Sequence, residues 1–175
     1  RLASEVIGSA LDRTARYLIR AGVTLEPAEV ITRLSQAVAR RLHERGVPWR
    51  PGVPELLRQV HKAGIPQAMV TMSYGENARR IAAAAGADIF TEVISGDVVA
   101  RGKPDPEPYR TAIERLGVDP SRTVAFEDSI PGLTSASRAG LITIGVPCVA
   151  PLEPGAGYEL WSTLVGIGVA DLERL

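Results

Sequence analysis

Cysteine, aromatic residues and net charge are scarce in this sequence, and each scarcity excludes a class of protein. One cysteine in 175 residues leaves no pair for an internal disulfide, so a disulfide-stapled secreted scaffold is excluded and the expected compartment is a reducing cytoplasm. The 20 basic residues balance the 20 acidic residues, so no net field attracts the protein to nucleic acid or to an anionic membrane. No apolar run approaches the roughly 20 residues that a transmembrane helix needs. We therefore expect a soluble globular protein without nucleic-acid or membrane partners, of unspecified oligomeric state.

The single cysteine, Cys148, lies in the apolar stretch 146–150. Free cysteine usually behaves as a small buried hydrophobic residue, whereas a reactive thiol needs an electropositive setting. The sequence therefore predicts a buried structural thiol at this position.

Apolar residues recur at helical spacing in the first 47 residues. The segment from Leu11 to about Arg20 carries them on one face, and a longer run between Pro27 and Gly46 repeats them every four positions, at Val30, Leu34, Val38 and Leu42. Proline is common at the start of a helix and glycine just after its end. Two packed helices are predicted here.

From Pro48 onward helical and strand patterns alternate, which is typical of a parallel sheet with helices on both faces. Helices are predicted over Val53–Ala63, Glu76–Ala85, Glu107–Leu116 and Gly132–Ala139, the last starting near Pro131. Strands are predicted over Gln67–Thr71, Ile89–Ser95, Thr123–Phe126 and Leu141–Val146, with a weak strand at Leu164–Val169.

Three groups of polar residues follow successive predicted strands. Thr71 and Ser73 follow the first, Lys103 lies in a Gly-Lys-Pro loop after the second, and Glu127 and Asp128 follow the third. The carboxyl ends of strands in such a sheet are where ligands bind. Hydroxyls can hold phosphate oxygens, an ammonium can pair with a phosphate, and two carboxylates suit Mg²⁺. Together these groups predict phosphoryl-transfer chemistry, which depends on positioning and charge neutralisation.

The same segments resemble motifs two, three and four of the haloacid dehalogenase superfamily, in its phosphoglucomutase-like and phosphoglycolate phosphatase-like branch. They are Val-Thr-Met-Ser at 70–73, Gly-Lys-Pro-Asp-Pro at 102–106, and Phe-Glu-Asp-Ser at 126–129 with Gly132. The match covers residues 50 to about 150. Residues 1–47 look like the later part of that branch's helical cap, in which Gly8 and Ser9, within Val6-Ile7-Gly8-Ser9, resemble the substrate loop.

The resemblance implies a Rossmann-like α/β core over residues 48–175 and a partial helical cap over residues 1–47. It also implies that Thr71 binds the transferring phosphate with help from Ser73, and that Lys103 pairs with this phosphate and the nucleophile. Asp128 would ligate Mg²⁺ directly and Glu127 would support the metal shell. The intact protein is accordingly expected to be a Mg²⁺-dependent phosphatase that acts on a small phosphorylated metabolite.

The family's first motif, Asp-x-Asp-Gly-Thr, does not occur in the 175 residues. In the family this motif carries the nucleophile and ends the first strand, at the centre of the sheet between the strands of Thr71 and Asp128. Without that strand, backbone groups on two buried strands would lack partners, at about 1–3 kcal/mol each. We expect the intact protein to have further N-terminal residues that supply it.

Other interpretations stay open at this stage. One is a catalytically inactive paralogue or fragment that works as a binding or dimerisation module. A phosphosugar mutase is another, although Leu11 stands where the β-phosphoglucomutase members carry an arginine for the distal phosphate. A receiver domain of the response-regulator type is disfavoured because the acid pair comes last along the chain.

The missing first motif generates a direct prediction for the 175-residue chain. On its own it should hydrolyse no phosphomonoester, because it lacks the family's nucleophile. An assay with an aryl phosphate and Mg²⁺ checks this, and Mg²⁺-dependent turnover by the purified chain would contradict it.

Overall fold

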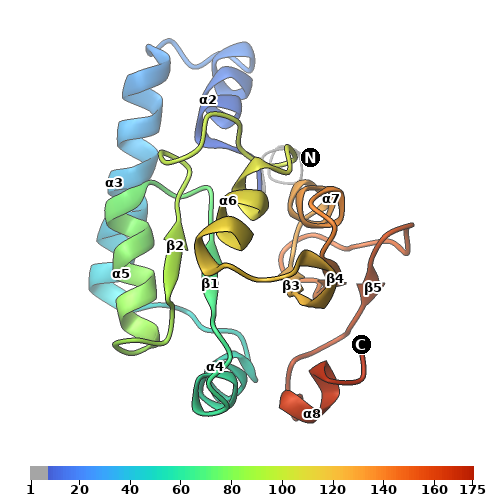
Figure 1. Ribbon diagram of the computed structural model, residues 1–175. Coiled ribbons are helices and arrows are strands. Elements are labelled where there is room, and N and C mark those ends of the chain that lie inside the picture. Colours follow the sequence, from blue (N-terminus) through green and yellow to red (C-terminus); the bar gives the residue numbers. More distant parts are fainter. Residues whose placement is uncertain (1–7) are drawn as a thin grey trace.

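The computed structural model describes residues 8–175 as an α/β protein with all of its strand pairs parallel (Figure 1). Val6 and Ile7 of the predicted substrate loop lie outside the described residues. The elements are α2 (Leu11–Arg20), α3 (Pro27–Arg45), α4 (Val53–Lys62), β1 (Ala68–Val70), α5 (Gly75–Ala85), β2 (Glu92–Ile94), α6 (Glu107–Leu116), η1 (Pro120–Arg122), β3 (Val124–Glu127), α7 (Ile130–Arg138), β4 (Ile142–Gly145), β5 (Glu159–Leu160) and α8 (Val169–Leu172).

The strands form two separate sheets within the described residues. β1 pairs with β2, and β3, β4 and β5 form a second sheet in that order. No hydrogen-bonded strand pair joins β1 to β3 in the part of the chain that the structure describes. The predicted α/β architecture with parallel strands is therefore confirmed.

Both faces of the second sheet are covered, as expected for parallel strands. Side chains alternate along β3, so Val124 and Phe126 pack on one face against a cluster that includes Leu56 of α4. On the other face, Ala125 packs against a cluster that includes Tyr109 of α6 and residues of α7. The period of two places the last residue of β3, Glu127, on the same face as Ala125 and Tyr109.

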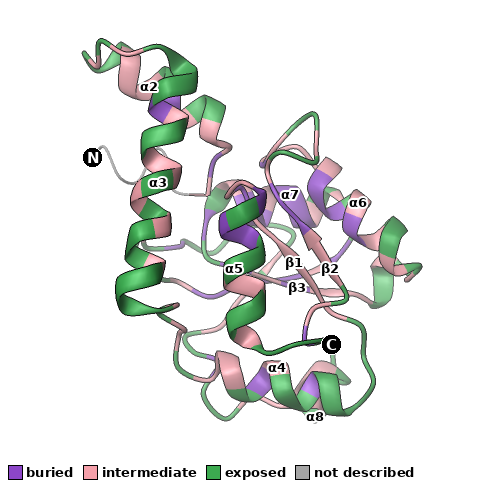
Figure 2. Cartoon of the chain, turned by 90° about the vertical axis from the view of Figure 1, so that its left-hand side faces the viewer, coloured by how far each residue is buried: buried purple, intermediate pink, exposed green. Residues whose placement is uncertain are grey.

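The two N-terminal helices have the predicted ranges and pack against each other. α3 runs beside α5, as Figure 2 shows. The side-chain amide of Asn77 in α5 donates to the backbone carbonyl of Ser35 in α3 at 2.8 Å. This partly buried hydrogen bond links the helical segment to the α/β region.

The structure corrects two local predictions. Cys148 is exposed, not buried, because it follows Pro147 in the turn beyond the end of β4. Leu164–Val169 is not a strand, since Gly166 has a φ of +81° and Val169 begins a helix. Glu127 lies at the tip of its strand as predicted, since β3 ends one residue later than expected and Glu127 is its buried last residue.

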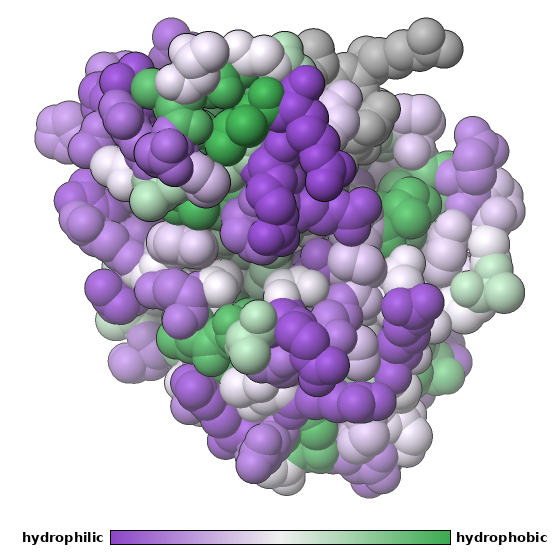
Figure 3. All heavy atoms as spheres, turned by 90° about the horizontal axis from the view of Figure 1, so that it is seen from above, coloured by the Kyte–Doolittle hydropathy of each residue, from purple (hydrophilic) through white to green (hydrophobic). Residues whose placement is uncertain are grey.

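The surface is mixed in character. On the face seen in Figure 3, apolar areas are separated by polar side chains. Among residues 8–175, no helix combines the length and the apolar character needed to cross a membrane.

Candidate active site at the carboxyl ends of the strands

A buried ion pair joins the ends of the two sheets. Lys103, in the loop before α6, is 6% exposed, and Glu127 at the end of β3 is 8% exposed. The Lys103 ammonium donates to Oε1 of Glu127 and, at 2.9 Å, to the backbone carbonyl of Val70 at the end of β1. The structure thus brings Lys103 to Glu127 and to the carbonyl of Val70, the residue before Thr71.

Tyr109 of α6 completes this buried cluster. Its hydroxyl donates to the same Oε1 of Glu127, and the Lys103 ammonium lies 5.1 Å from the centre of its ring. Burial and the Glu127 charge raise the pKa of Tyr109 well above its usual value. The phenol therefore stays protonated and acts as a hydrogen-bond donor across the physiological range.

Gly132 in the first turn of α7 makes room for the Glu127 carboxylate. A Cβ atom built on Gly132 would overlap that carboxylate. The preceding Ser129 caps the helix by accepting a hydrogen bond from the Gly132 amide at 3.3 Å, as is typical of serine at this position. The sequence Glu-Asp-Ser-x-x-Gly thus fixes both the helix start and the position of the acid.

Asp128 differs from Glu127 in that its side chain is open to solvent. The surrounding protein atoms partly desolvate it. This desolvation is the larger cause of its raised pKa and the negative charge of Glu127 is the next, whereas the positive charges of Lys103 and Arg50 act to lower the pKa. A bound cation would stabilise the ionised form of a carboxylate that lies beside another carboxylate.

The two carboxylates fit Mg²⁺ by their chemistry, because this ion prefers oxygen ligands and often uses only one or two carboxylates. They would supply a part of its coordination shell. Across residues 8–175, no three His, Cys, Asp or Glu side chains gather as a complete metal site.

Thr71 and Ser73 lie where β1 ends. The Thr71 amide donates to the carbonyl of Ile94 in β2 at 2.8 Å, which holds the residue beside the sheet. Its hydroxyl oxygen accepts a hydrogen bond from the Ser73 amide at 3.1 Å. Accepting this bond leaves the hydroxyl proton of Thr71 available for an anion.

The loop before α2 lies against residues next to two of the groups of polar residues, the acid pair and Lys103. A Cβ atom on Gly8, whose φ is +73°, would overlap the side chain of Ser129 next to the acid pair. A Cβ atom on Gly102, next to Lys103, would lie 2.7 Å from Cβ of Ala10. Ser9 is buried, and no residue of the described chain donates to or accepts from its hydroxyl.

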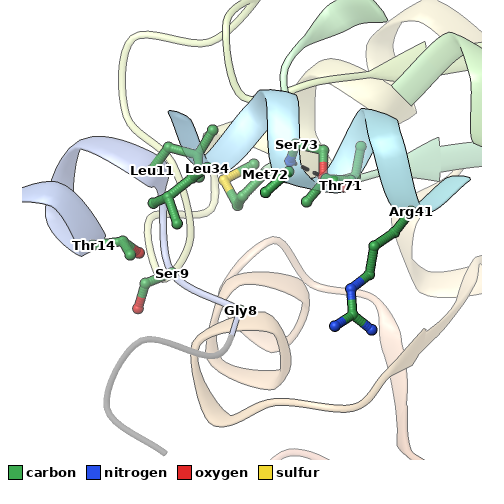
Figure 4. A pocket seen from close by; sticks show the side chains of 11 residues that line it. Gly8, Ser9, Leu11, Thr14, Leu34, Arg41, Thr71, Met72 and Ser73 are labelled. Atoms are coloured by element: carbon green, nitrogen blue, oxygen red, sulfur yellow. Dashed lines mark hydrogen bonds between the residues drawn. The ribbon is translucent and has the colours of Figure 1, made fainter. Parts of the chain in front are cut away.

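A cleft of about 460 Å³ lies between this loop, α3 and the end of β1 (Figure 4). Its lining combines hydroxyls, apolar side chains and one cation: Gly8, Ser9, Leu11, Thr14, Leu34, Ala37, Val38, Arg41, Thr71, Met72 and Ser73. Lys103 and the acid pair are not among these lining residues. Predicted phosphate-binding hydroxyls and the predicted substrate loop thus share one cleft, next to the buried ion pair.

Sequence reasoning misses two residues of this region. Arg41 has charged neighbours that indicate a solvated surface, although it continues the helical face of Leu34 and Val38 into the cleft. Tyr109 falls within a predicted helix without a predicted role, although its position on the apolar face of that helix is a signal for contact with the sheet.

Comparison with known proteins gives a family match. The sequence pattern of the haloacid dehalogenase-like hydrolases matches residues 10–140. A validoxylamine A 7'-phosphate phosphatase from Streptomyces hygroscopicus subsp. limoneus is 38% identical over 96 residues, which is 54% of this chain and 45% of that protein. The chain spans about half the length of the curated relatives it matches first.

Solved structures of CbbY from Rhodobacter sphaeroides are similar over nearly the whole chain. The complex of CbbY with phosphate has a TM-score of 0.86 at 30% identity, covering 98% of this chain and 81% of that one. A complex of a CbbY variant with xylulose-1,5-bisphosphate has a TM-score of 0.81 at 31% identity, covering 98% and 80%.

The raised pKa of Asp128 predicts that its charge destabilises the metal-free fold. A raised pKa means that the folded state binds the proton more tightly than the unfolded state. Protonation of Asp128 therefore stabilises the folded state. This stabilisation is fully present at pH values below the ordinary aspartate pKa, and it is lost as the pH rises through the raised pKa of the folded state. Asp128→Asn should therefore raise the melting temperature at pH 7 in metal-free buffer, and the gain should vanish below the ordinary pKa.

Asp119 is a suitable control because its pKa is shifted in the opposite direction to that of Asp128. Hydrogen bonds from Ser121 lower its pKa, so its charged form stabilises the fold at neutral pH and Asp119→Asn should give no gain. Melting curves at several pH values measure both effects. An Asp128→Asn protein that melts no higher than the unaltered protein at pH 7 would contradict the prediction.

Proposed function

Because the chain belongs to the haloacid dehalogenase-like hydrolase family, we propose that it is part of a Mg²⁺-dependent phosphatase that acts on a small phosphorylated metabolite. The observation that carries this proposal is the position of Lys103. Its ammonium is held between the end of β1 and the end of β3, so a phosphate bound at Thr71 would lie beside a fixed positive charge. Relatives that are themselves named phosphatases support the same class of reaction.

In the proposed site, Thr71 and Ser73 bind the transferring phosphoryl group and Lys103 neutralises part of its charge. Glu127 and Asp128 hold Mg²⁺, which when bound would neutralise further negative charge on the phosphoryl oxygens. Hydroxyls and an ammonium placed before the substrate arrives are effective because they need little reorganisation during the reaction.

We assign the nucleophile to an aspartate outside these 175 residues, which contain no Asp-x-Asp-Gly-Thr motif. Its carboxylate would attack phosphorus and break the P–O bond to the metabolite, whose oxygen takes up a proton and leaves as an alcohol. Water would then attack phosphorus, give up a proton and release inorganic phosphate, which regenerates the carboxylate. The helical segment over residues 1–47 serves in this proposal as part of a cap that excludes bulk water.

We place the remainder of the metabolite in the cleft under α3. The apolar side chains of Leu34 and Val38 would contact its carbon skeleton, and Arg41 would bind a second anionic group. Support comes from the lining itself, because Arg41 is the one cationic side chain among the described residues that line the cleft. The CbbY complex with xylulose-1,5-bisphosphate is a similar structure with a ligand that carries two phosphates.

Removing the charge of Lys103 or of Asp128 should abolish turnover by the full-length protein. We expect Lys103→Ala and Asp128→Ala each to lower kcat by at least about 100-fold with an aryl phosphate, since single charge-stabilising groups contribute on this scale. The sequence's other lysine, Lys62, is exposed at the end of α4, so Lys62→Ala is the matched control. Near-normal rates for either site variant would overturn the assignment.

The role of Arg41 predicts a selective loss of binding. In the full-length protein, Arg41→Ala should raise KM for a sugar bisphosphate by about tenfold, as expected for a charge-assisted hydrogen bond, with kcat little changed. KM for a simple aryl phosphate should not change. Arg40→Ala is the control, because Arg40 is the exposed neighbour of Arg41 and does not line the cleft. Equal KM values for the two variants would exclude the role of Arg41.

A further inference from the structure

We propose that Tyr109 is a positioning residue that sets the orientation of the Glu127 carboxylate, so that Oε1 is held by the protein and Oε2 is left for the metal site. The inference rests on the proposed function, because it concerns the same Mg²⁺ site. It assigns a role to a residue outside the three groups of polar residues that follow the strands.

The first step is the distribution of donors on the carboxylate. Tyr109 and Lys103 both donate to Oε1. Each oxygen of an ionised carboxylate offers about two lone-pair positions, so these two donors satisfy Oε1. No described residue donates a hydrogen bond to Oε2, and this oxygen remains available to a cation or to a water molecule of its shell.

The second step is the rigidity of the donor. Tyr109 is 6% exposed and packs in a cluster with Ala125 of β3 and with Ala136 of α7. Because its ring is held on the buried face of α6, its hydroxyl oxygen is held in one position, beside Oε1 of Glu127. The position of the Tyr109 hydroxyl is therefore set by packing in the hydrophobic core and does not depend on a bound metal ion.

The third step is the link to Lys103. The ammonium lies 5.1 Å from the centre of the Tyr109 ring, within the range of a cation–π contact. One side chain thus contacts both members of the ion pair, through its ring and through its hydroxyl. Without the hydroxyl, Oε1 would keep one donor, and the terminal torsion of glutamate, which is intrinsically broad, would be free to exchange the two oxygens.

The test uses Tyr109→Phe in the full-length protein, since phenylalanine keeps the ring and removes only the hydroxyl. Mg²⁺ affinity is measured by titration calorimetry without substrate, and kcat and KM are measured separately. We expect the Kd for Mg²⁺ to rise about tenfold, the typical cost of removing a group that orients a metal ligand. kcat at saturating Mg²⁺ should change much less than Kd.

Tyr158→Phe is the matched control, because it removes the hydroxyl of an exposed tyrosine that donates to the Glu153 carbonyl. A second comparison uses Glu127→Gln: if Tyr109 acts through Glu127, adding Tyr109→Phe to this variant should not weaken Mg²⁺ binding further. Melting curves of all variants check that each folds.

The outcomes separate the two proposals. A tenfold weaker Mg²⁺ affinity in Tyr109→Phe, absent in the Glu127→Gln background, supports the positioning role whether or not the protein is a phosphatase. An unchanged Kd in a folded Tyr109→Phe protein overturns it, even if the unaltered enzyme is an active phosphatase. A lower melting temperature with an unchanged Kd would show that Tyr109 serves packing alone, which also overturns it.

Discussion

The buried ion pair between Lys103 and Glu127 constrains where the ends of the two sheets lie. Two charges removed from water are stable only when each satisfies the other, and removing one partner of such a pair typically costs about 3–5 kcal/mol. Lys103 also donates to the carbonyl of Val70, so its ammonium links β1 to β3, which do not pair directly within residues 8–175. This link holds the end of β1, which precedes Thr71, close to the end of β3, where the acid pair lies.

Much of the architecture follows from local sequence signals. The helices over Leu11–Arg20 and Glu107–Leu116 lie where they are predicted, the first from apolar residues on one face and the second from its end at Gly117. Strands β1, β2 and β4 are shorter than predicted. A strand extends only as far as its hydrogen-bonded partner, and the apolar run around Ile89 begins before its partner in β1. The meeting of Lys103 with Glu127 was predictable because parallel strands end at one edge.

The rest of the site depends on tertiary contacts that no local pattern encodes. Tyr109 meets Glu127 only because α6 packs on the face of β3 that Ala125 shares. Arg41 reaches the cleft because α3 lies along α5, and the exposed position of Val38 is explained by the same cleft. The apolar neighbours of Cys148 predict burial, but the turn after Pro147 directs it to solvent.

The close approach of Gly8 to Ser129 has a consequence for chimeric proteins. Any side chain at residue 8 would occupy the space of the Ser129 side chain, and the φ of +73° independently favours glycine. A helical segment transplanted from a relative to change the metabolite would therefore have to bring a glycine at this contact. The substrate preference of such a chimera thus depends on how closely the backbone at residue 8 can approach Ser129, and not only on the residues that line the cleft.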